Sequence, residues 1–251
     1  MTNLQDHLRR HRRAVLLFSG GLDSSLLLAV AAQTLGPGFC ALTFTGPHSA
    51  PGELAVAWAL ARRLKVRHLV RSFAPLDVPD FRENTRQRCY ACKRAIITQA
   101  WEVARAQGAE VLWDGTNLDD LGDFRPGLQA AKEMGVASPL LEVGLNKAAI
   151  RVLSRTLGLP WQKPAQSCLA TRFPYGTRLT PEALKMVGQG EAWLLRRGFS
   201  HVRLRRPAAG VARLELNPEE WPLFLAPQVR GPFYALVRRL GCDRLSLDLP
   251  K

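Results

Sequence analysis

A short glycine- and serine-rich segment near the start of the chain has the residue types that bind phosphate. It reads Ser19-Gly-Gly-Leu-Asp-Ser-Ser25, and it lies between an apolar run that predicts a strand and a helical pattern. Two glycines let backbone N–H groups approach an anion, and the N-terminus of the following helix favours negative charge. Serine hydroxyls add donors, and the Asp23 carboxylate can hold Mg²⁺ against phosphate oxygens. The sequence therefore predicts a nucleotide-phosphate site made of Ser19, Gly20, Gly21, Asp23, Ser24 and Ser25.

A second polar turn, Asp114-Gly-Thr-Asn117, follows a later apolar run. Ligands of open parallel sheets bind at the carboxyl ends of the strands, so we expect Gly115, Thr116 and Asn117 to lie beside the first loop. That loop contains no lysine, so it matches neither the GxxxxGK[ST] loop nor the GxGxxG fingerprint. Ordinary tight turns use the same residue types, and this remains the alternative for each segment taken alone.

Three of the five cysteines have a spacing that suits metal or redox chemistry. Cys89 and Cys92 form a Cys-Tyr-Ala-Cys motif just before a predicted helix, and Cys168 lies in a later loop segment. Three thiolates can hold a 4Fe-4S cluster and leave one iron open for chemistry. Basic residues adjoin both segments, and nearby positive charge lowers the pKa of a thiol. From spacing alone a structural or unused CxxC remains the alternative, while Cys40 and Cys242 are expected in the core.

The first loop resembles that of the pyrophosphate-loop ATP enzymes, whose SGGxDS signature it matches in full. Two further segments, Gly-Asp-Phe-Arg-Pro-Gly at 122–127 and Ser-Cys-Leu-Ala-Thr-Arg-Phe-Pro-Tyr-Gly at 167–176, resemble the LarE-type sulfur transferases of nickel-pincer nucleotide biosynthesis. The match spans nearly the whole chain. It implies an adenine nucleotide alpha hydrolase-like fold and an enzyme that forms AMP and pyrophosphate. In this family a carboxylate of pyridinium-3,5-biscarboxylate mononucleotide is adenylated and converted to a thiocarboxylate.

The resemblance implies two alternative sulfur sources. In one type of the family a cysteine gives up its own sulfur and becomes dehydroalanine. In the other type three cysteines hold a 4Fe-4S cluster that passes on an extra sulfide. Cys89, Cys92 and Cys168 place this chain with the second type, and Cys168 occupies the sulfur-donor position in either. The implied cofactors are ATP, Mg²⁺ and the 4Fe-4S cluster, with Cys168 and Asp23 as catalytic residues.

Basic residues in the C-terminal part are candidates for holding the mononucleotide. His201, Arg203 and Arg205 alternate along a predicted strand, so their side chains point to one face. Two guanidiniums on one face suit a phosphate and carboxylates, although a solvated strand face is the alternative from the residues alone. By the resemblance, Arg203 and Arg205 match paired arginines near the substrate, and Glu191 matches a carboxylate there. The remaining candidates are Arg172 at the substrate and Arg125 at the nucleotide.

The composition is that of a basic, folded chain. Its 251 residues are 47% hydrophobic and 22% charged, which suits a packed core. The 35 Lys+Arg, of which 28 are arginine, exceed the 21 Asp+Glu for a net charge of +14. Arginine binds phosphate and carboxylate, so an anionic ligand is expected, with a solvated basic surface as the alternative. No apolar run approaches the ~20 residues of a membrane span, and five cysteines do not suit a disulfide framework. We therefore expect a cytoplasmic protein with reduced thiols.

Apolar runs that alternate with helical patterns predict a Rossmann-like α/β fold with a parallel sheet. Strands are expected at residues 14–18, 39–44, 66–70 and 110–113, and helices at 24–35, 52–64, 93–107 and 146–157. Later residues predict a helix at 181–197, a hairpin of 201–206 with 211–216, helices after 217 and at 232–240, and a strand at 245–249. The predicted parts are an ATP-binding domain (1–160), a cysteine-bearing linker (161–180) and a small α+β domain for substrate or oligomerisation (181–251).

Two other functions fit parts of the sequence. A 4Fe-4S tRNA thiolase of the same superfamily also combines a CxxC with a third cysteine and suits a basic chain. Several such enzymes add zinc-binding cysteine pairs, which this chain lacks, and aromatic residues interleaved for base stacking are not evident. A non-catalytic nucleotide sensor would bind ATP without releasing pyrophosphate. The sequence therefore favours a small-molecule mononucleotide substrate over nucleic acid and, by the resemblance, a tendency to form homo-oligomers, with the source of sulfur left open.

Overall fold

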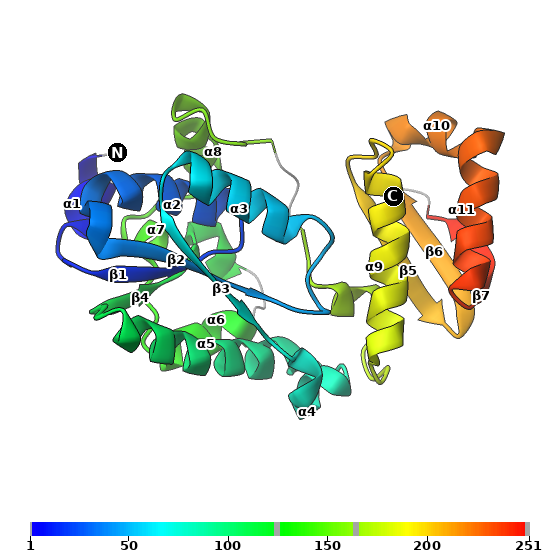
Figure 1. Cartoon of the computed structure of the whole chain (residues 1–251), viewed down its shortest axis with the longest axis horizontal. Helices are drawn as coiled ribbons and strands as arrows, with labels where there is room; N and C mark the ends of the chain where they lie inside the picture. The colour runs from blue at the N-terminus through cyan, green and yellow to red at the C-terminus, as the bar shows by residue number, and fades with distance from the viewer. Residues whose placement is uncertain (1, 123–125, 163–165, 249–251) are drawn as a thin grey trace. The chain divides into compact units, whose positions relative to one another are not determined.

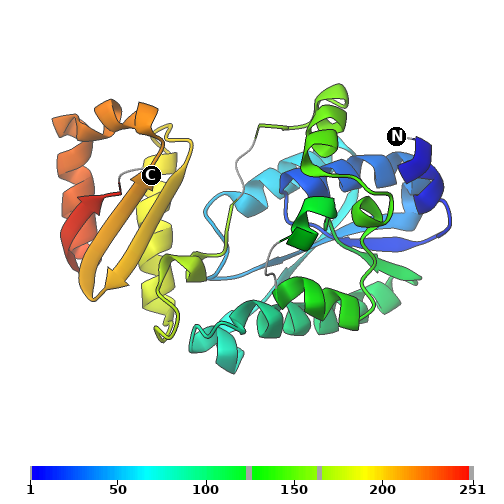
Figure 2. The ribbon, with the colours of Figure 1, turned by 180° about the vertical axis from the view of Figure 1, so that it is seen from behind.

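The computed structural model describes residues 2–122, 126–162 and 166–248, which form two compact units (Figure 1, and from behind in Figure 2). The sequence-based division assigns all of residues 1–160 to the first domain, yet two short segments of that range belong to the second unit. They bond to the loop that carries Cys168; for example, the Leu169 N–H donates to the His48 carbonyl oxygen at 2.9 Å. The first unit comprises Met1–Gly46, Glu53–Ala74 and Gln87–Gln166, and the second comprises Pro47–Gly52, Pro75–Arg86 and Ser167–Lys251.

The first unit is built on a four-stranded sheet in the order β3-β2-β1-β4. All neighbouring strands run parallel, and the register pairs Ala14 with both Phe39 and Val111. Helical segments connect the strands, so the predicted Rossmann-like α/β fold is confirmed. The strands are β1 (Ala14–Leu17), β2 (Phe39–Thr45), β3 (Arg67–Ser72) and β4 (Val111–Trp113).

Helices cover both faces of this sheet (Figure 1). Side chains alternate along β1, so that Leu16 packs into the core on one face and Val15 packs with Ile97 on the other. Burial on both faces explains why the strands read as continuous apolar runs. One face carries α1 (Thr2–Leu8), α2 (Leu22–Leu35), α3 (Glu53–Arg63), α7 (Pro139–Glu142) and α8 (Lys147–Thr156); the other carries α5 (Arg88–Ala106) and α6 (Pro126–Glu133).

Some helices of the first unit differ from the sequence-based prediction. The helices α1, α6 and α7 are not predicted, because they have only seven, eight and four residues and too few turns for a clear 3.6-residue pattern. Helix α5 begins at Arg88 rather than at Lys93, so Cys89 and Cys92 lie in its first turns and not before it. Residues three apart lie on the same face of a helix, so the two thiols share a face.

The second unit contains a three-stranded sheet in the order β5-β6-β7. The predicted hairpin forms from antiparallel β5 (Val202–Ala208) and β6 (Gly210–Leu216), and β7 (Cys242–Leu247) runs parallel to β6. Thr180 caps α9 as predicted, because its hydroxyl accepts from the Ala183 N–H at 3.2 Å. Helix α11 begins at Pro227 rather than at Pro232, since proline suits the first helical position. The helices are α4 (Pro79–Arg82), α9 (Pro181–Leu195), α10 (Trp221–Leu225) and α11 (Pro227–Arg239).

Apolar side chains of the sheet and helices form the core of the second unit. Leu204 of β5 and Leu214 of β6 are fully buried, as are Phe233 and Val237 of α11. Across the described residues of both units, no helix combines the length and the apolar character needed to span a membrane.

Candidate functional site

The glycine-rich loop turns the chain from β1 into α2. Gly20 has a φ of +71°, and a Cβ at this position would lie 3.2 Å from the Ala57 Cβ of α3. Gly21 is the N-cap of α2, and among the described residues this helix has no side-chain cap hydrogen bond. The Ser24 hydroxyl lies 3.1 Å from Ser19 Oγ and donates to the Gly21 carbonyl oxygen at 3.2 Å. The uncapped amides stand at the positive end of a 14-residue helix, where an anion binds well.

The turn that contains Gly115 lies against this loop. A Cβ on Gly115 would come within 2.8 Å of the Ser24 backbone nitrogen, so glycine is needed for this approach. Asp114 fixes the turn, since its Oδ1 accepts from the Thr116 N–H at 3.1 Å and from the Ser138 hydroxyl at 2.8 Å. The two segments that the sequence predicts at one phosphate site therefore meet at the carboxyl ends of β1 and β4.

Lys147 also lies at this site, although it is not among the residues predicted from the sequence. Its Nζ donates to Asp23 Oδ2 at 2.6 Å, and both side chains are mostly buried. Lys147 is the first residue of α8, and Asn146 caps that helix by accepting from the Ala149 N–H at 2.9 Å. A lysine in the first turn opposes the helix dipole, and this unfavourable placement was the signal in the sequence. The loop has no lysine of its own, so Lys147 supplies a cation from another element.

Two buried polar atoms near this loop have no partner among the described residues. They are an acceptor, Asp23 Oδ1, and a donor, Asn117 Nδ2. Asn117 is fully buried, and its Oδ1 already accepts from the Asp119 N–H at 3.0 Å. Buried polar groups without partners cost free energy, and a bound ligand satisfies them. A carboxylate oxygen is also a suitable Mg²⁺ ligand, so this edge of the sheet fits a nucleotide phosphate with its cation.

Arg172 and Glu191, both predicted at the substrate, form a buried ion pair within the second unit. Arg172 Nε donates to Glu191 Oε1 at 2.5 Å and Nη2 donates to Oε2 at 3.2 Å. Glu191 Oε1 also accepts from the Leu204 N–H at 2.9 Å, and Arg172 Nη1 donates to Ser167 Oγ at 2.8 Å. These bonds occupy both side chains, so they suit the positioning of the Cys168 segment better than contact with substrate.

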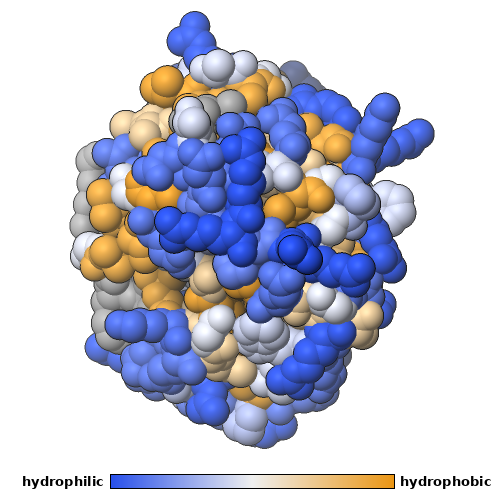
Figure 3. Space-filling model, turned by 90° about the vertical axis from the view of Figure 1, so that its left-hand side faces the viewer, coloured by the Kyte–Doolittle hydropathy of each residue, from blue (hydrophilic) through white to orange (hydrophobic). Residues whose placement is uncertain are grey.

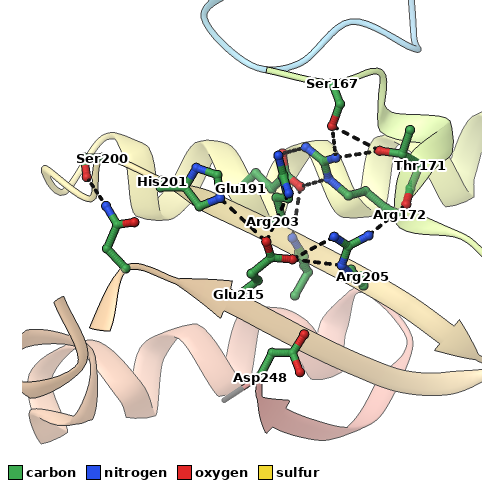
Figure 4. Close-up of polar contacts among 12 residues, drawn as sticks. Ser167, Thr171, Arg172, Glu191, Ser200, His201, Arg203, Arg205, Glu215 and Asp248 are labelled. Carbon is green, nitrogen blue, oxygen red and sulfur yellow. Dashed lines mark hydrogen bonds and ion pairs between the residues drawn. The ribbon is translucent and has the colours of Figure 1, made fainter. Parts of the chain in front are cut away.

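Arg203 and Arg205 of β5 surround one carboxylate of β6, as Figure 4 shows. Arg205 Nε and Nη2 donate to Glu215 Oε2 at 2.9 and 2.8 Å, and Arg203 Nη1 donates to Glu215 Oε1 at 3.1 Å. His201 Nε2 lies 3.7 Å from the same carboxylate. The three basic side chains therefore share one face, as their alternation along the strand predicts. About a quarter of each side chain remains exposed, so the group is open to solvent.

Glu215, the partner of these arginines, is not among the residues predicted from the sequence. Burial raises the pKa of the Glu215 carboxyl, but the hydrogen bond from Arg205 and the charges of Arg205, Arg203 and His201 lower this pKa overall. The carboxylate thus stays ionised at neutral pH and orients two guanidiniums. The signal was the hairpin register, which places Glu215 directly opposite Arg203. Because one carboxylate faces two arginines, the group has a net positive charge, and this charge can attract an anion.

The three cysteines of the predicted cluster are shared between the units. Cys89 is exposed and Cys92 half-buried on α5 of the first unit, whereas Cys168 is half-buried in the second unit. Cys40 and Cys242 are buried, which confirms their expected place in the core. In the part of the chain that the structure describes, no three His, Cys, Asp or Glu side chains gather as metal ligands. The cluster therefore stays a prediction, and it requires thiols from both units.

Within the second unit, the Cys168 segment is fastened to the chain that leads into α5. Asn84 is fully buried with a φ of +51°, a conformation that asparagine tolerates better than most residues. Its Nδ2 donates to the Pro174 carbonyl oxygen at 2.7 Å, and its own carbonyl accepts from the Gly176 N–H at 3.0 Å. Asn84 therefore anchors the Cys168 segment within the second unit.

The Gly-Asp-Phe-Arg-Pro-Gly motif is described only in part. Arg125, predicted at the nucleotide, lies outside the described residues. Gly127 belongs to α6, where a Cβ would lie 3.6 Å from the Cys89 carbonyl oxygen. This motif therefore ends beside the CxxC motif within the first unit.

Known proteins are similar in sequence to this chain. The family model for asparagine synthase matches residues 3–105, which include the glycine-rich loop. An uncharacterized protein of Synechocystis is 39% identical over 99% of this chain and 93% of its own. The pyridinium-3,5-bisthiocarboxylic acid mononucleotide synthase of Lactiplantibacillus plantarum is 33% identical over 95% of this chain and 86% of its own. A 7-cyano-7-deazaguanine synthase of Anaeromyxobacter dehalogenans is 32% identical over 60% of this chain and 80% of its own.

Proposed function

The chain belongs to the LarE-type family of ATP-dependent sulfur transferases within the pyrophosphate-loop ATPases, and from this premise we propose its substrate and the roles of its residues. The protein is an ATP-using sulfurtransferase. The proposed substrate is pyridinium-3,5-biscarboxylate mononucleotide, one carboxylate of which becomes a thiocarboxylate. This reaction serves the biosynthesis of the nickel-pincer nucleotide.

The observation that carries this proposal is the set of unused polar groups at the carboxyl ends of β1 and β4. The uncapped N-terminus of α2, the partnerless Asp23 Oδ1 and the partnerless Asn117 Nδ2 lie on the same two segments. Lys147 adds a positive charge that balances phosphate oxygens. Mg²⁺ bound at Asp23 would neutralise further phosphate charge. The proposed nucleotide contacts are Ser19, Gly20, Gly21, Asp23, Ser24, Ser25, Gly115, Thr116, Asn117 and Arg125.

The proposed reaction has two steps. A carboxylate oxygen of the substrate attacks the α-phosphorus of ATP, pyrophosphate leaves, and an acyl adenylate forms. A sulfur nucleophile then attacks the acyl carbon, the carbon–oxygen bond to the phosphate breaks, and AMP leaves with both electrons of that bond. Adenylation is needed because an unactivated carboxylate oxygen is a poor leaving group.

Arg203 and Arg205 are proposed to hold the phosphate and free carboxylate of the mononucleotide. Glu215 orients both guanidiniums, and their partial exposure leaves donors for an incoming anion. Arg172 and Glu191 are proposed as positioning residues that hold the Cys168 segment next to β5.

Cys168 is proposed as the residue through which sulfur reaches the activated carbon. Cys89 and Cys92 present two thiols on one face of α5, and this donor chemistry fits a 4Fe-4S cluster completed by Cys168. A bound cluster would supply sulfide without consuming a cysteine. The alternative is that Cys168 gives up its own sulfur. A half-buried thiol on an anchored segment suits both this route and the cluster route.

Pyrophosphate release tests the proposed function. Pyrophosphate should appear only when ATP and the mononucleotide are both present, and a sensor would release none. Asp23→Asn and Lys147→Met should each lower the rate at least tenfold, since each removes a charge beside the phosphates. Lys132→Met, an exposed lysine on α6, is the matched control and should keep the wild-type rate. Release that requires tRNA instead of the mononucleotide would contradict the proposal and favour a tRNA thiolase.

A further inference from the structure

A cavity of about 360 Å³ opens at the amino-terminal ends of β1, β2 and β3. The strand register aligns these ends, because Ala14 pairs with Phe39 and Cys40 pairs with Arg67. The glycine-rich loop follows the carboxyl end of β1, so the cavity lies at the opposite edge of the same sheet. Its volume falls in the range of small-molecule sites. It is therefore a second candidate site within the first unit, separate from the proposed nucleotide site.

Three arginines and no acidic side chain line this cavity among the residues that the structure describes. They are Arg12 and Arg13, just before β1, and Arg67 at the start of β3. None of the three forms an ion pair with a residue that the structure describes. Glu110 is the nearby carboxylate, and it accepts from the backbone N–H of Arg12 at 3.2 Å. Three uncompensated guanidiniums around one opening attract an anion and can bind it in a bidentate manner.

Two glycines leave room for Arg12 and Arg13 at the cavity wall. A Cβ on Gly38 would overlap the Arg12 carbonyl oxygen, so glycine lets the start of β2 approach the chain before β1. Gly108 has a φ of +62°, and a Cβ there would lie 2.9 Å from Arg13 Nη1. The guanidinium of Arg13 therefore lies over a backbone position that has no side chain. Backbone constraints as well as side chains therefore shape this wall.

The remaining wall of the cavity is apolar or neutral. Ala14, Phe39 and Cys40 contribute buried surface, and Gln107 adds one carboxamide beside the arginines. Figure 3 views the first unit from the side where β1 begins in Figure 1, and hydrophilic side chains cover most of that face. A cavity with an apolar wall and arginines at its opening suits a ligand that has an anionic group at one end and an apolar organic part at the other. We propose that this cavity binds a small organic phosphate, with the phosphate on the arginines and the organic part against the strand ends.

Protection from phenylglyoxal, which modifies exposed arginines, tests this proposal residue by residue. The full-length protein is treated with phenylglyoxal while ribose 5-phosphate is titrated, and modification is measured by peptide mass spectrometry. Ribose 5-phosphate should protect Arg13 and Arg67 with one saturable dose dependence. Arg238 and Arg239, which are exposed on α11, should stay unprotected in the same sample. Ribose without phosphate should protect none of them.

Two variants separate a built site from general charge attraction. Ala109→Phe fills the cavity without changing charge and should raise the concentration for half-protection of Arg67 at least tenfold. Arg13→Gln should weaken the protection of Arg67 to a similar degree, because one phosphate is shared. Equal protection of Arg238, or unchanged protection of Arg67 in both variants, would overturn the site. Inorganic phosphate that protects as well as ribose 5-phosphate would overturn recognition of the organic part.

Discussion

Arg172 and Glu191 form a buried ion pair in the second unit. The side chains of Arg172 and Glu191 are only 3% and 2% exposed, and Glu191 also binds the β5 backbone. Removal of one partner leaves an unpaired buried charge, which costs far more than loss of a surface ion pair. These two residues were predicted from the resemblance to touch substrate, yet the geometry gives them a structural reason to be present.

Glu191→Gln should lower the free energy of unfolding of the second unit by about 3–5 kcal/mol, because Arg172 then keeps its charge without a carboxylate. Chemical denaturation followed by the fluorescence of tryptophans in that unit measures this loss. Glu219→Gln, an exposed glutamate in the same unit, is the control and should change stability by less than about 0.5 kcal/mol. A loss for Glu191→Gln no larger than the control's would show that the pair contributes little.

Substitution of Arg203 and Arg205 should affect substrate binding, whereas substitution of the buried pair should affect stability. Changing both to alanine should raise the KM for the mononucleotide by roughly a hundredfold, about tenfold for each charged hydrogen bond, and leave the KM for ATP unchanged. Steady-state kinetics with each substrate varied in turn measures the split. The Arg238→Ala, Arg239→Ala double variant removes the same charge from α11 and should leave both KM values as they are. An equal rise in the KM for ATP would contradict a substrate-specific role.

Among the elements, the close approach of the β4 turn to the start of α2 determines the geometry of the phosphate site. Gly115→Ala places a Cβ about 2.8 Å from the Ser24 nitrogen, so the two segments must separate. The KM for ATP should rise at least tenfold, while β1 and β4 should remain paired. Gly231→Ala on α11, where a Cβ meets no atom within 4 Å, is the control and should have no effect on ATP. Normal ATP kinetics for Gly115→Ala would show that this contact does not shape the site.

The junction of β2 and β3 makes the stability of the first unit depend on pH. The Thr43 hydroxyl donates to the Phe18 carbonyl oxygen at 2.6 Å, and His68 Nε2 lies 2.7 Å from that hydroxyl. Burial lowers the pKa of His68, so below the ordinary value of about 6.5 the unfolded chain binds a proton that the folded chain resists. Stability should therefore fall as the pH decreases from 7 toward 5.

His68→Gln keeps a donor for Thr43 and removes the titrating group, so the decrease in stability between pH 7 and pH 5 should become shallower. Burial also lowers the pKa of His48, which belongs to the second unit, so the pH dependence that His48 gives to that unit should be unchanged in the variant. Urea unfolding at several pH values measures both slopes. Identical slopes in the wild type and the variant would remove His68 as a cause.

The elements that the sequence predicts well are those with strong local patterns. The strands of the first sheet and helix α2 have long apolar runs, and helix α9 has clear capping residues. The short helices α1 and α7 have too few turns for a periodic pattern, although Ser138 and Pro139 stand at the start of α7. Helix α5 extends back over the CxxC motif because nothing between Arg88 and Lys93 breaks a helix. Local sequence patterns thus determine the type and order of the helices and strands, while tertiary packing determines the residues at which each one begins and ends.

For the whole molecule, the sequence identifies which residues carry chemistry better than it identifies their partners. The loop at Ser19 and the turn at Gly115 could be predicted to meet, because parallel strands end at a common edge. The roles of Lys147 and Glu215 could not be predicted in this way. Their partners, such as Asp23 for Lys147, are distant in sequence, and tertiary packing places them together. The same holds for the insertion of 47–52 and 75–86 into the second unit.

The most direct test of the account is mass spectrometry of products and protein after reaction of anaerobically purified enzyme with ATP, Mg²⁺, sulfide and the mononucleotide. If the cluster supplies the sulfide, the thiocarboxylate product should exceed the enzyme in amount and Cys168 should remain intact. Cys89→Ala and Cys92→Ala should each lose iron and limit the product to one molecule per enzyme or fewer, whereas Cys242→Ala should retain both. Conversion of Cys168 to dehydroalanine with a single turnover would contradict the cluster route, and the absence of any thiocarboxylate would contradict sulfur transfer itself.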